Sequence, residues 1–303
     1  MILILNHPTK NCGVHQFGRR IADLLLQSKV LSVVYREINT AIDYNSLLDA
    51  LKPRIVIANW YPITMGWLSD NLLRPTIKNY FLFHDGHMRG KFDKIIFCGN
   101  YEKPDAIRYT DDQKMLLPRP LLKYDGDYPV NSVPNIGSFG FGFWHKGFHD
   151  IVTKVNNEFS EAVINLHMPY AHFGDESGIQ AREVAERCRE NNKNPNITLN
   201  ITSDLKSEEQ ILDFLAKNDI NAFMYGGVSE GISSVLDYAL SVRRPIALTN
   251  NMMFRHILSD DNIITDDNTI GKILDKGVAP LERFYTEWSI ENFIQRAEEL
   301  LHG

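Results

Sequence analysis

The segment YGGVSEGISSVLDYALSVRRPIALT, residues 225–249, holds the residues best suited to bind a phosphorylated sugar. It opens with Gly226 and Gly227 after a short apolar run, and a helical pattern starts near Ser233. The start of a helix offers unpaired backbone N–H groups to a phosphate, and a serine there can cap the helix or donate to the ligand. Glu230 lies just before this helix, where a carboxylate can accept hydrogen bonds from sugar hydroxyls. The structural alternative is a plain helix cap at Ser233 and a surface charge at Glu230.

Two further loops could approach a phosphate. The loop GSFGFGFWHKGF, residues 137–148, connects a predicted strand to Lys146, and a lysine held at a strand-to-helix turn can neutralise a diphosphate as a point charge. The loop NCGVHQFGRR, residues 11–20, follows the first apolar run, and Gly13 in it lets the backbone come close to a ligand at a helix start. An ordinary strand-to-helix turn also explains Gly13. Because this loop matches neither GxGxxG nor the Walker pattern, we expect neither a dinucleotide nor a P-loop nucleotide there.

The sequence FHDGHM, residues 83–88, places His84, Asp85 and His87 directly after a predicted buried strand. The carboxyl edge of a parallel sheet is where α/β folds keep their sites, so this polar cluster is a further candidate for chemistry. Two histidines three residues apart beside an aspartate also suggest a metal site. No further ligand cluster accompanies them, and the three cysteines of the chain show no CxxC spacing, so we expect no bound metal.

The elements that position these loops alternate between strand and helix, as in parallel α/β domains. Short apolar runs without strict alternation recur between amphipathic stretches, which is typical of parallel strands buried under helices. The segment KYDGDYPVNSVPN, residues 123–135, interrupts the rhythm, so we expect an N-terminal domain at residues 1–128 and a C-terminal domain at residues 129–303. Both are predicted to be Rossmann-like, doubly wound parallel-sheet domains that face each other across a cleft. The last amphipathic stretch, residues 281–301, is predicted to form a long helix that crosses back to the first domain.

Composition indicates an ordinary globular protein, with 44% hydrophobic and 23% charged residues. No apolar run approaches the roughly 20 residues that span a bilayer. The start MILILNHPTKNCG has no basic region and no cleavage site, so we interpret it as a buried strand and not as a signal peptide. Together with the odd number of cysteines, these features predict a cytoplasmic protein.

Charge is unevenly distributed along the chain. Residues 1–123 contain 17 Lys and Arg against 11 Asp and Glu, a net charge of +6, whereas the remainder contains 15 against 27, a net charge of −12. A basic first half suggests an anionic partner, such as a phospholipid-linked or phosphorylated acceptor, and a weak contact with the inner face of a membrane. A solvated surface without a partner is the alternative. We expect no nucleic-acid partner.

Taken in order, these segments resemble the retaining GT-B glycosyltransferases of the glycosyltransferase family 4 type over nearly the whole chain. The most specific part, SEGISSVLDYALSVRRPIALT, looks like the EGFGLPxLEAMAxGxPVVAS block of that family, with Glu230, Gly231 and Pro245 matching without a gap. IGSFGFGFWHKG resembles the strand, loop and Lys-Gly that open the second domain. CGVHQFGRRIADLL is similar to the family's GG-hydrophobic helix start, and FHDGHM with the later DKIIFCG is similar to its histidine loop.

The resemblance implies transfer of a sugar from a nucleotide-diphosphate sugar to a glycan, lipid-linked or small-molecule acceptor, as in cell-envelope glycan biosynthesis. It implies retention of the anomeric configuration, no metal and no cofactor besides the donor substrate. His84 and Glu230 would be the catalytic residues, His84 close to the reacting carbon and the acceptor, and Glu230 beside the transferred sugar. The donor would be bound by the remaining positions: Gly13, Ser138, Lys146, Gly231, Ile232, Ser233, Ser234 and Asp237.

Two departures from the family pattern leave an alternative open. The family's second glutamate, which holds the donor ribose, falls on Tyr238, and the nearest acid, Asp237, is rotated by about 100° on a helix. The arginine of the family's Gly-Arg pair falls on Ser138. The alternative is a catalytically degenerate GT-B protein that binds a nucleotide or a glycan without transfer.

Overall fold

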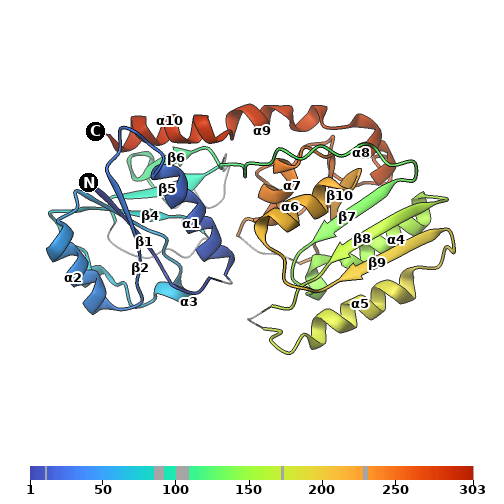
Figure 1. Cartoon of the computed structure of the whole chain (residues 1–303), viewed down its shortest axis with the longest axis horizontal. Coiled ribbons are helices and arrows are strands. Elements are labelled where there is room, and N and C mark those ends of the chain that lie inside the picture. The colour runs from blue at the N-terminus through green and yellow to red at the C-terminus, as the bar shows by residue number, and fades with distance from the viewer. Residues whose placement is uncertain (11, 85–91, 100–108, 172–173, 228–230, 303) are drawn as a thin grey trace. The chain divides into compact units, whose positions relative to one another are not determined.

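The computed structural model describes residues 1–10, 12–84, 92–99, 109–171, 174–227 and 231–302. Contacts between residues divide the chain into two compact units, each with its own sheet. The first unit consists mainly of Met1–Pro120 and Glu287–Gly303, and the second mainly of Leu121–Ser229 and Val235–Thr286. Figure 1 shows the helices and strands of each unit.

The first unit is built on a six-stranded parallel sheet, whose strands are β1 (Ile2–Asn6), β2 (Val33–Glu37), β3 (Ile55–Ala58), β4 (Lys78–Leu82), β5 (Lys94–Cys98) and β6 (Lys114–Leu117). Their order across the sheet is β2-β1-β3-β4-β5-β6. Ile2 of β1 lies opposite Val33 of β2 on one side and Ile55 of β3 on the other. The strands β1 and β3 are buried along their whole length, because helices cover both faces of a parallel sheet.

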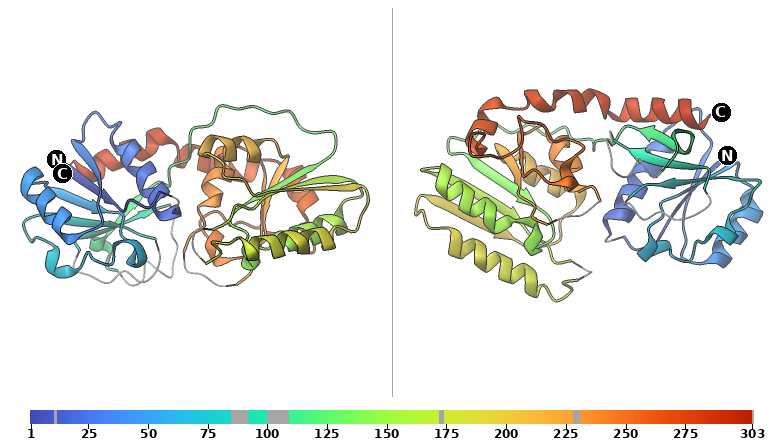
Figure 2. Two further views of the ribbon diagram at one scale, coloured as in Figure 1. Left: turned by 60° about the horizontal axis from the view of Figure 1, so that its bottom comes forward. Right: turned by 180° about the vertical axis from the view of Figure 1, so that it is seen from behind.

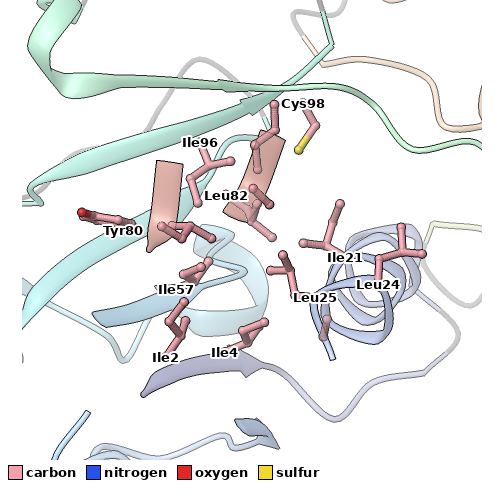
Figure 3. Packing of buried hydrophobic residues seen from close by; sticks show 14 of the residues in the cluster. Ile2, Ile4, Ile21, Leu24, Leu25, Ile57, Tyr80, Leu82, Ile96 and Cys98 are labelled. Carbon is pink, nitrogen blue, oxygen red and sulfur yellow. The ribbon is translucent and has the colours of Figure 1, made fainter. Parts of the chain in front are cut away.

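The helices of the first unit are α1 (Gly13–Leu25), α2 (Ala41–Leu51), α3 (Pro62–Met65) and α10 (Ile290–Leu301), with the 3-10 turns η1 (Asp70–Leu72) and η3 (Asp111–Gln113). Figure 3 shows one face of the sheet, where Ile4 and Leu82 of the strands pack with Ile21 and Leu25 of α1. The helix α10 joins this core through its apolar face, Phe293, Ala297 and Leu301. The alternate strand residues point to the opposite face, which α2 and α3 cover.

The second unit is built on a five-stranded parallel sheet, whose strands are β7 (Asn135–Phe139), β8 (Ala162–His167), β9 (Ile197–Thr202), β10 (Ile220–Phe223) and β11 (Ile246–Leu248). Their order is β11-β10-β7-β8-β9, and every pairing is parallel. The predicted α/β class with two doubly wound parallel sheets is therefore confirmed.

The helices of the second unit are α4 (Phe148–Glu158), α5 (Ile179–Asn191), α6 (Glu208–Ala216), α7 (Val235–Ser241), α8 (Ile270–Lys276) and α9 (Glu282–Glu287), with the 3-10 turns η4 (Trp144–Lys146), η5 (Met252–Phe254) and η6 (Ala279–Leu281). Figure 2 shows α4 and α5 lying along this sheet. Their buried residues, among them Ile151, Val155 and Val184, form one core with Ile136 and Ile164 of the strands. Ser207 and Gln210 form a capping box at the start of α6, which fixes the residue at which this helix begins.

The stretch at residues 281–301 forms two helices and not the single long helix that its amphipathic pattern predicts. The helix α9 ends at Glu287, and α10 starts only at Ile290. Trp288, between them, is 1% exposed, and the hydroxyl of Ser289 caps α10 by accepting a hydrogen bond from Asn292 N (3.2 Å). Burial of the indole and the favourable cap offset the lost helical turn.

In the part of the chain that the structure describes, no helix combines the length and the apolar character that a membrane crossing would require.

The packing of α10 leads to a stability prediction. Phe293 is 0% exposed, so Phe293→Ala should lower the free energy of unfolding by roughly 3–5 kcal/mol, through lost burial and a cavity. Urea unfolding followed by circular dichroism would measure this loss. The matched control is Gln295→Ala on the exposed side of the same helix, which should change the free energy by less than about 0.5 kcal/mol. Equal effects of the two variants would contradict the packing of α10 on the sheet.

Candidate functional site

Each sheet contains one pair of neighbouring strands at which the chain reverses its direction of winding. These strands are β1 and β3 in the first unit, and β7 and β10 in the second. Loops that leave the carboxyl ends of such a pair run to opposite faces of the sheet, and ligands of open α/β sheets bind between them. We call the residues at the carboxyl ends of β1 and β3 the first-unit site, and those at the carboxyl ends of β7 and β10 the second-unit site.

The first-unit site is built around two buried asparagines, Asn6 at the end of β1 and Asn59 directly after β3. Both are 0% exposed, so their amide groups need partners inside the protein. Asn6 Nδ2 donates to His15 O (3.0 Å) and to the hydroxyl oxygen of Tyr35 (3.1 Å). Asn6 Oδ1 accepts from His7 N (3.0 Å) and from Asn59 Nδ2 (2.8 Å). The two amides therefore join both strand ends to the first turn of α1.

His84, which follows β4, contacts this pair of amides. Its Nε2 lies 2.6 Å from Asn59 Oδ1, and its ring packs edge-on against Phe17 with a centroid distance of 5.9 Å. The guanidinium of Arg119 lies 4.6 Å from the centroid of the same Phe17 ring. Burial, reinforced by the positive charge of Arg119 and by His7, lowers the pKa of His84 to about 3. The imidazole is therefore neutral near pH 7.

A pair of histidines, His7 and His15, lies beside these residues, with ring centroids 5.5 Å apart. His7 is 1% exposed; its Nδ1 accepts from Thr9 N (3.3 Å), and its Nε2 has no hydrogen-bond partner in the described part of the chain. Burial, reinforced by His15 and opposed by Glu37, lowers the pKa of His7 to about 4. His15 Nε2 lies 2.9 Å from Glu37 Oε1. Among the described residues, no three His, Cys, Asp or Glu side chains are grouped as metal ligands would be.

Gly13 is the first residue of α1. A Cβ atom added there would meet no atom within 4 Å, so the backbone at this point faces open space. Cys12 makes no side-chain cap, and the first turn carries no acid, so an anion at this helix start would meet N–H groups without competition from a carboxylate. Asn59 Nδ2 also donates to Val14 O (2.7 Å), and through Asn59 the structure brings His84 and the first turn of α1 together.

The second-unit site begins with the loop between β7 and α4. The turn η4 ends at Gly147, whose φ is +64°, a conformation that residues with a Cβ atom rarely adopt. A Cβ atom there would also collide with Met224 O, directly after β10. Gly226 N donates to His145 O (2.8 Å), which joins the loops after β7 and β10. Glycine is thus required at position 147 by two independent constraints.

Lys146 carries the charge of the second-unit site. Its Nζ lies 4.0 Å from the ring centroid of Tyr225, and within the described residues it makes no hydrogen bond and no ion pair. Tyr225 is 4% exposed and packs on Phe254, with a centroid distance of 4.6 Å. Asn251 Nδ2 donates to Tyr225 O (3.2 Å) and Gly227 O (2.9 Å), which supports the loop after β10. The aromatic ring attracts the ammonium but does not neutralise its charge, as a carboxylate would.

The other predicted donor-binding residues lie near α7 and in β7. Ser138 is part of β7 and is 1% exposed. The helix α7 begins at Val235, two residues later than predicted, and Asp237 in its first turn is 0% exposed. Tyr238, at the position of the family's second glutamate, donates from its hydroxyl to Glu208 Oε2 (3.4 Å).

The remaining predicted site residues lie in the segment before α7. Gly231, Ile232 and Ser234 are partly exposed, and Ser233 is 5% exposed. Glu230 lies outside the described residues. The binding roles of these residues stay predictions.

Motif spacing did not indicate Asn6, Asn59 or Tyr225. A signal was present for the first two, because each asparagine follows an apolar run, ILIL or IVIA. A polar residue directly after a buried parallel strand lies at the carboxyl edge of the sheet, where ligands bind. Tyr225 lies two residues after the end of β10, and only its contact with Lys146 distinguishes it from a core aromatic.

The buried histidines lead to a prediction for stability against pH. The folded-state pKa values of His7 and His84 are lowered to about 4 and about 3, so the unfolded chain binds more protons below about pH 6.5. The free energy of unfolding should therefore fall as the pH decreases from about 6.5 towards 4, by at most about 1.4 kcal/mol per pH unit for each histidine. Urea unfolding at a series of pH values measures this slope.

His7→Asn tests the contribution of one ring. An asparagine oxygen can replace Nδ1 as the acceptor for Thr9 N, while the titrating group is lost. The slope between pH 6.5 and 5 should become smaller, and the difference between the two proteins should be constant above pH 7.5. An unchanged slope would show that His7 does not cause the acid sensitivity.

The sequence matches no model of a known protein family. No curated protein has significant sequence similarity to it either. Solved structures do match. HepE from Anabaena, in complex with UDP and glucose, aligns with 12% identity and a TM-score of 0.67 over 99% of this chain and 98% of HepE.

Two further structures are similar over the whole length. A glycosyltransferase from Rickettsia africae has 11% identity and a TM-score of 0.70, with 99% of this chain and 97% of that chain covered. AviGT4, a glycosyltransferase involved in avilamycin A biosynthesis, has 13% identity and a TM-score of 0.63, with 100% and 98% covered. At such identities the likeness establishes the fold, and the chain has the GT-B fold with two Rossmann-like domains.

Proposed function

We propose that this protein transfers a sugar from a nucleotide-diphosphate sugar to a glycan, lipid-linked or small-molecule acceptor. The observation that carries the proposal is the Lys146 ammonium at the second-unit site, which lies over the Tyr225 ring and has no carboxylate partner among the described residues. A diphosphate leaving group gains negative charge as the bond to the sugar breaks, and a fixed positive charge stabilises that state. A lysine without a carboxylate partner can supply this charge at no cost of breaking an ion pair.

The surroundings of Lys146 support a phosphate ligand. The lysine lies at the carboxyl ends of β7 and β10, on a turn whose geometry is held by Gly147 and Met224. The binding of UDP and UDP-glucose by HepE, which has the same fold, supports a nucleotide sugar as the donor. The resemblance of the SEGISSVLDYALSVRRPIALT block to retaining family 4 enzymes supports retention and independence from metal.

The proposal assigns the remaining roles as follows. The N–H groups at the start of α1, which Gly13 opens, face an anionic group of the donor or the acceptor. His84, neutral and partly buried, lines the place of the reacting sugar. Glu230 binds sugar hydroxyls, and the backbone from Gly231 to Ser234 binds sugar and phosphate.

A second candidate is a protein that binds a nucleotide or a glycan without transfer. The burial of Asp237, which is 0% exposed, favours it, since a buried carboxylate does not reach a ribose hydroxyl. Tyr238 also replaces the acid at the family's ribose position. Binding of a donor together with the absence of transfer across a panel of acceptors would establish this candidate.

Removal of the Lys146 ammonium tests the donor site. Lys146→Ala should weaken binding of the nucleoside diphosphate by roughly 1.5–3 kcal/mol, the range of a hydrogen bond to a charged group. Thermal-shift titrations with UDP, GDP, ADP and CDP in the presence of EDTA identify the base, and isothermal titration then compares the variants.

The matched control is Lys272→Ala, on the exposed surface of α8 in the same unit, which should leave the affinity unchanged. A Lys146→Ala protein that binds as tightly as wild type would exclude Lys146 from the site. A requirement for a divalent cation would contradict metal independence.

Glu230 is tested through turnover. Glu230→Ala removes a carboxylate that accepts hydrogen bonds from the sugar, so product formation at saturating donor should fall by a factor of roughly 10 to 100, equivalent to about 1.5–3 kcal/mol. The melting temperature without ligand should stay that of wild type. Analysis of the product anomer by NMR decides between retention and inversion, and wild-type turnover in the variant would remove Glu230 from the mechanism.

A further inference from the structure

The orientation of the Asn6 amide is determined by backbone groups. Its Oδ1 faces His7 N (3.0 Å), and its Nδ2 faces His15 O (3.0 Å). A backbone N–H can only donate a hydrogen bond, and a backbone carbonyl can only accept one. An exchange of the oxygen and nitrogen of this amide would place donor against donor and acceptor against acceptor, so the assignment is unambiguous.

The orientation of the Asn59 amide follows in the same way. Its Nδ2 lies 2.7 Å from Val14 O and 2.8 Å from Asn6 Oδ1, and both of these oxygens accept. The two amide hydrogens of Asn59 are therefore both used. Asn59 Oδ1 remains, and it faces His84 Nε2 at 2.6 Å. Because a carbonyl oxygen can only accept, the hydrogen of this bond belongs to His84 Nε2.

We infer that Asn59 is a positioning residue that fixes His84 as the Nε2–H tautomer, which leaves Nδ1 as a hydrogen-bond acceptor. No group among the described residues forms a hydrogen bond with Nδ1. Because the one N–H of the neutral ring is donated to Asn59, the other ring nitrogen of His84 can act only as an acceptor. The identity of that ligand, a hydroxyl of the donor sugar or of the acceptor, depends on the proposed function.

The charges around His84 keep its imidazole neutral. Among the described residues, Arg119 and His7 are the titratable groups that act on it, and neither carries negative charge. Burial and the Arg119 charge keep the imidazole unprotonated, and His7, with its own pKa lowered to about 4, is also neutral near pH 7. In a glycosyl transfer His84 would accept a hydrogen bond from a hydroxyl, and it would have no proton to give to the leaving group.

The close packing of α1 prevents Asn59 from adopting another rotamer. Gly18 lies against the Asn59 amide, and a Cβ atom at Gly18 would collide with it. The amide is 0% exposed, and Asn59 N donates to Leu5 O (2.9 Å) from the backbone. Side chain and backbone of Asn59 are thus both held, which is the condition for control of a neighbouring tautomer.

Nitrogen-15 NMR of histidine-labelled protein tests the inference directly. Long-range proton–nitrogen correlations distinguish the Nε2–H from the Nδ1–H tautomer, and His84→Gln identifies the His84 signals by their loss. Wild-type His84 should show the neutral Nε2–H pattern from pH 8 to pH 5. A predominant Nδ1–H tautomer in wild type would overturn the inference without any variant.

Asn59→Asp tests the control of His84 by residue 59. A carboxylate beside the imidazole should raise the pKa of His84 by about 1–3 units, so that a protonated fraction becomes measurable at pH 5 in the variant and not in wild type. The control Asn262→Asp places a carboxylate at a buried asparagine of the second unit and should leave the His84 signals unchanged. A folded Asn59→Asp protein with wild-type His84 signals would contradict the contact.

These measurements use no nucleotide sugar. They therefore decide the role of Asn59 even if the protein transfers no sugar, and the donor-binding experiments with Lys146 decide the proposed function even if the tautomer is the opposite one.

Discussion

The hydrogen bond between Asn59 Nδ2 and Asn6 Oδ1 joins the two strand ends at which the first sheet reverses its winding. Both side chains are fully buried, so each donor and acceptor needs a partner, and loss of one amide would leave the others unpaired at about 1–3 kcal/mol for each group. The first turn of α1, the backbone of His7 and the ring of His84 all depend on this pair, because each supplies one of its partners. The geometry of the first-unit site thus follows from two residues that belong to no motif.

In the second unit, the strand ends are joined because Gly147 has no side chain. Its loops approach at Gly147 and Met224 O with no room for a Cβ atom, and the bond from Gly226 N to His145 O closes the contact. This approach places Lys146 over Tyr225. Amide oxygens would have occupied the N–H donors of the lysine, whereas an aromatic ring contacts the ammonium without using these donors.

The two units therefore offer different chemistry. The first contributes an uncharged imidazole acceptor and the start of a helix, and the second contributes a fixed positive charge. A neutral histidine can accept a hydrogen bond from a sugar hydroxyl, and the lysine ammonium can attract a diphosphate. The proposed sugar transfer needs both interactions. Burial disfavours charge on His84 and His7, whereas Lys146 is only partly buried and contacts the Tyr225 ring.

Hydrophobic periodicity in the sequence was sufficient for the α/β class, for most helices and strands and for the glycine-rich loop that ends in Lys146, since these follow from local patterns of burial and turn chemistry. The break at Trp288 and Ser289 was not predicted, because the burial of an indole depends on what surrounds it in the fold. The burial of α7 on nearly all sides, and hence the inaccessibility of Asp237, likewise depends on packing in the fold. The pairing of Asn6 with Asn59 spans 53 residues and depends on the order of the strands. The amino-acid sequence by itself determined which elements form and which loops can approach a phosphate. Only the tertiary structure decided which amides meet, and hence which nitrogen of His84 carries the proton. The physical reason is that a hydrogen bond between distant residues exists only once the sheet has brought them together.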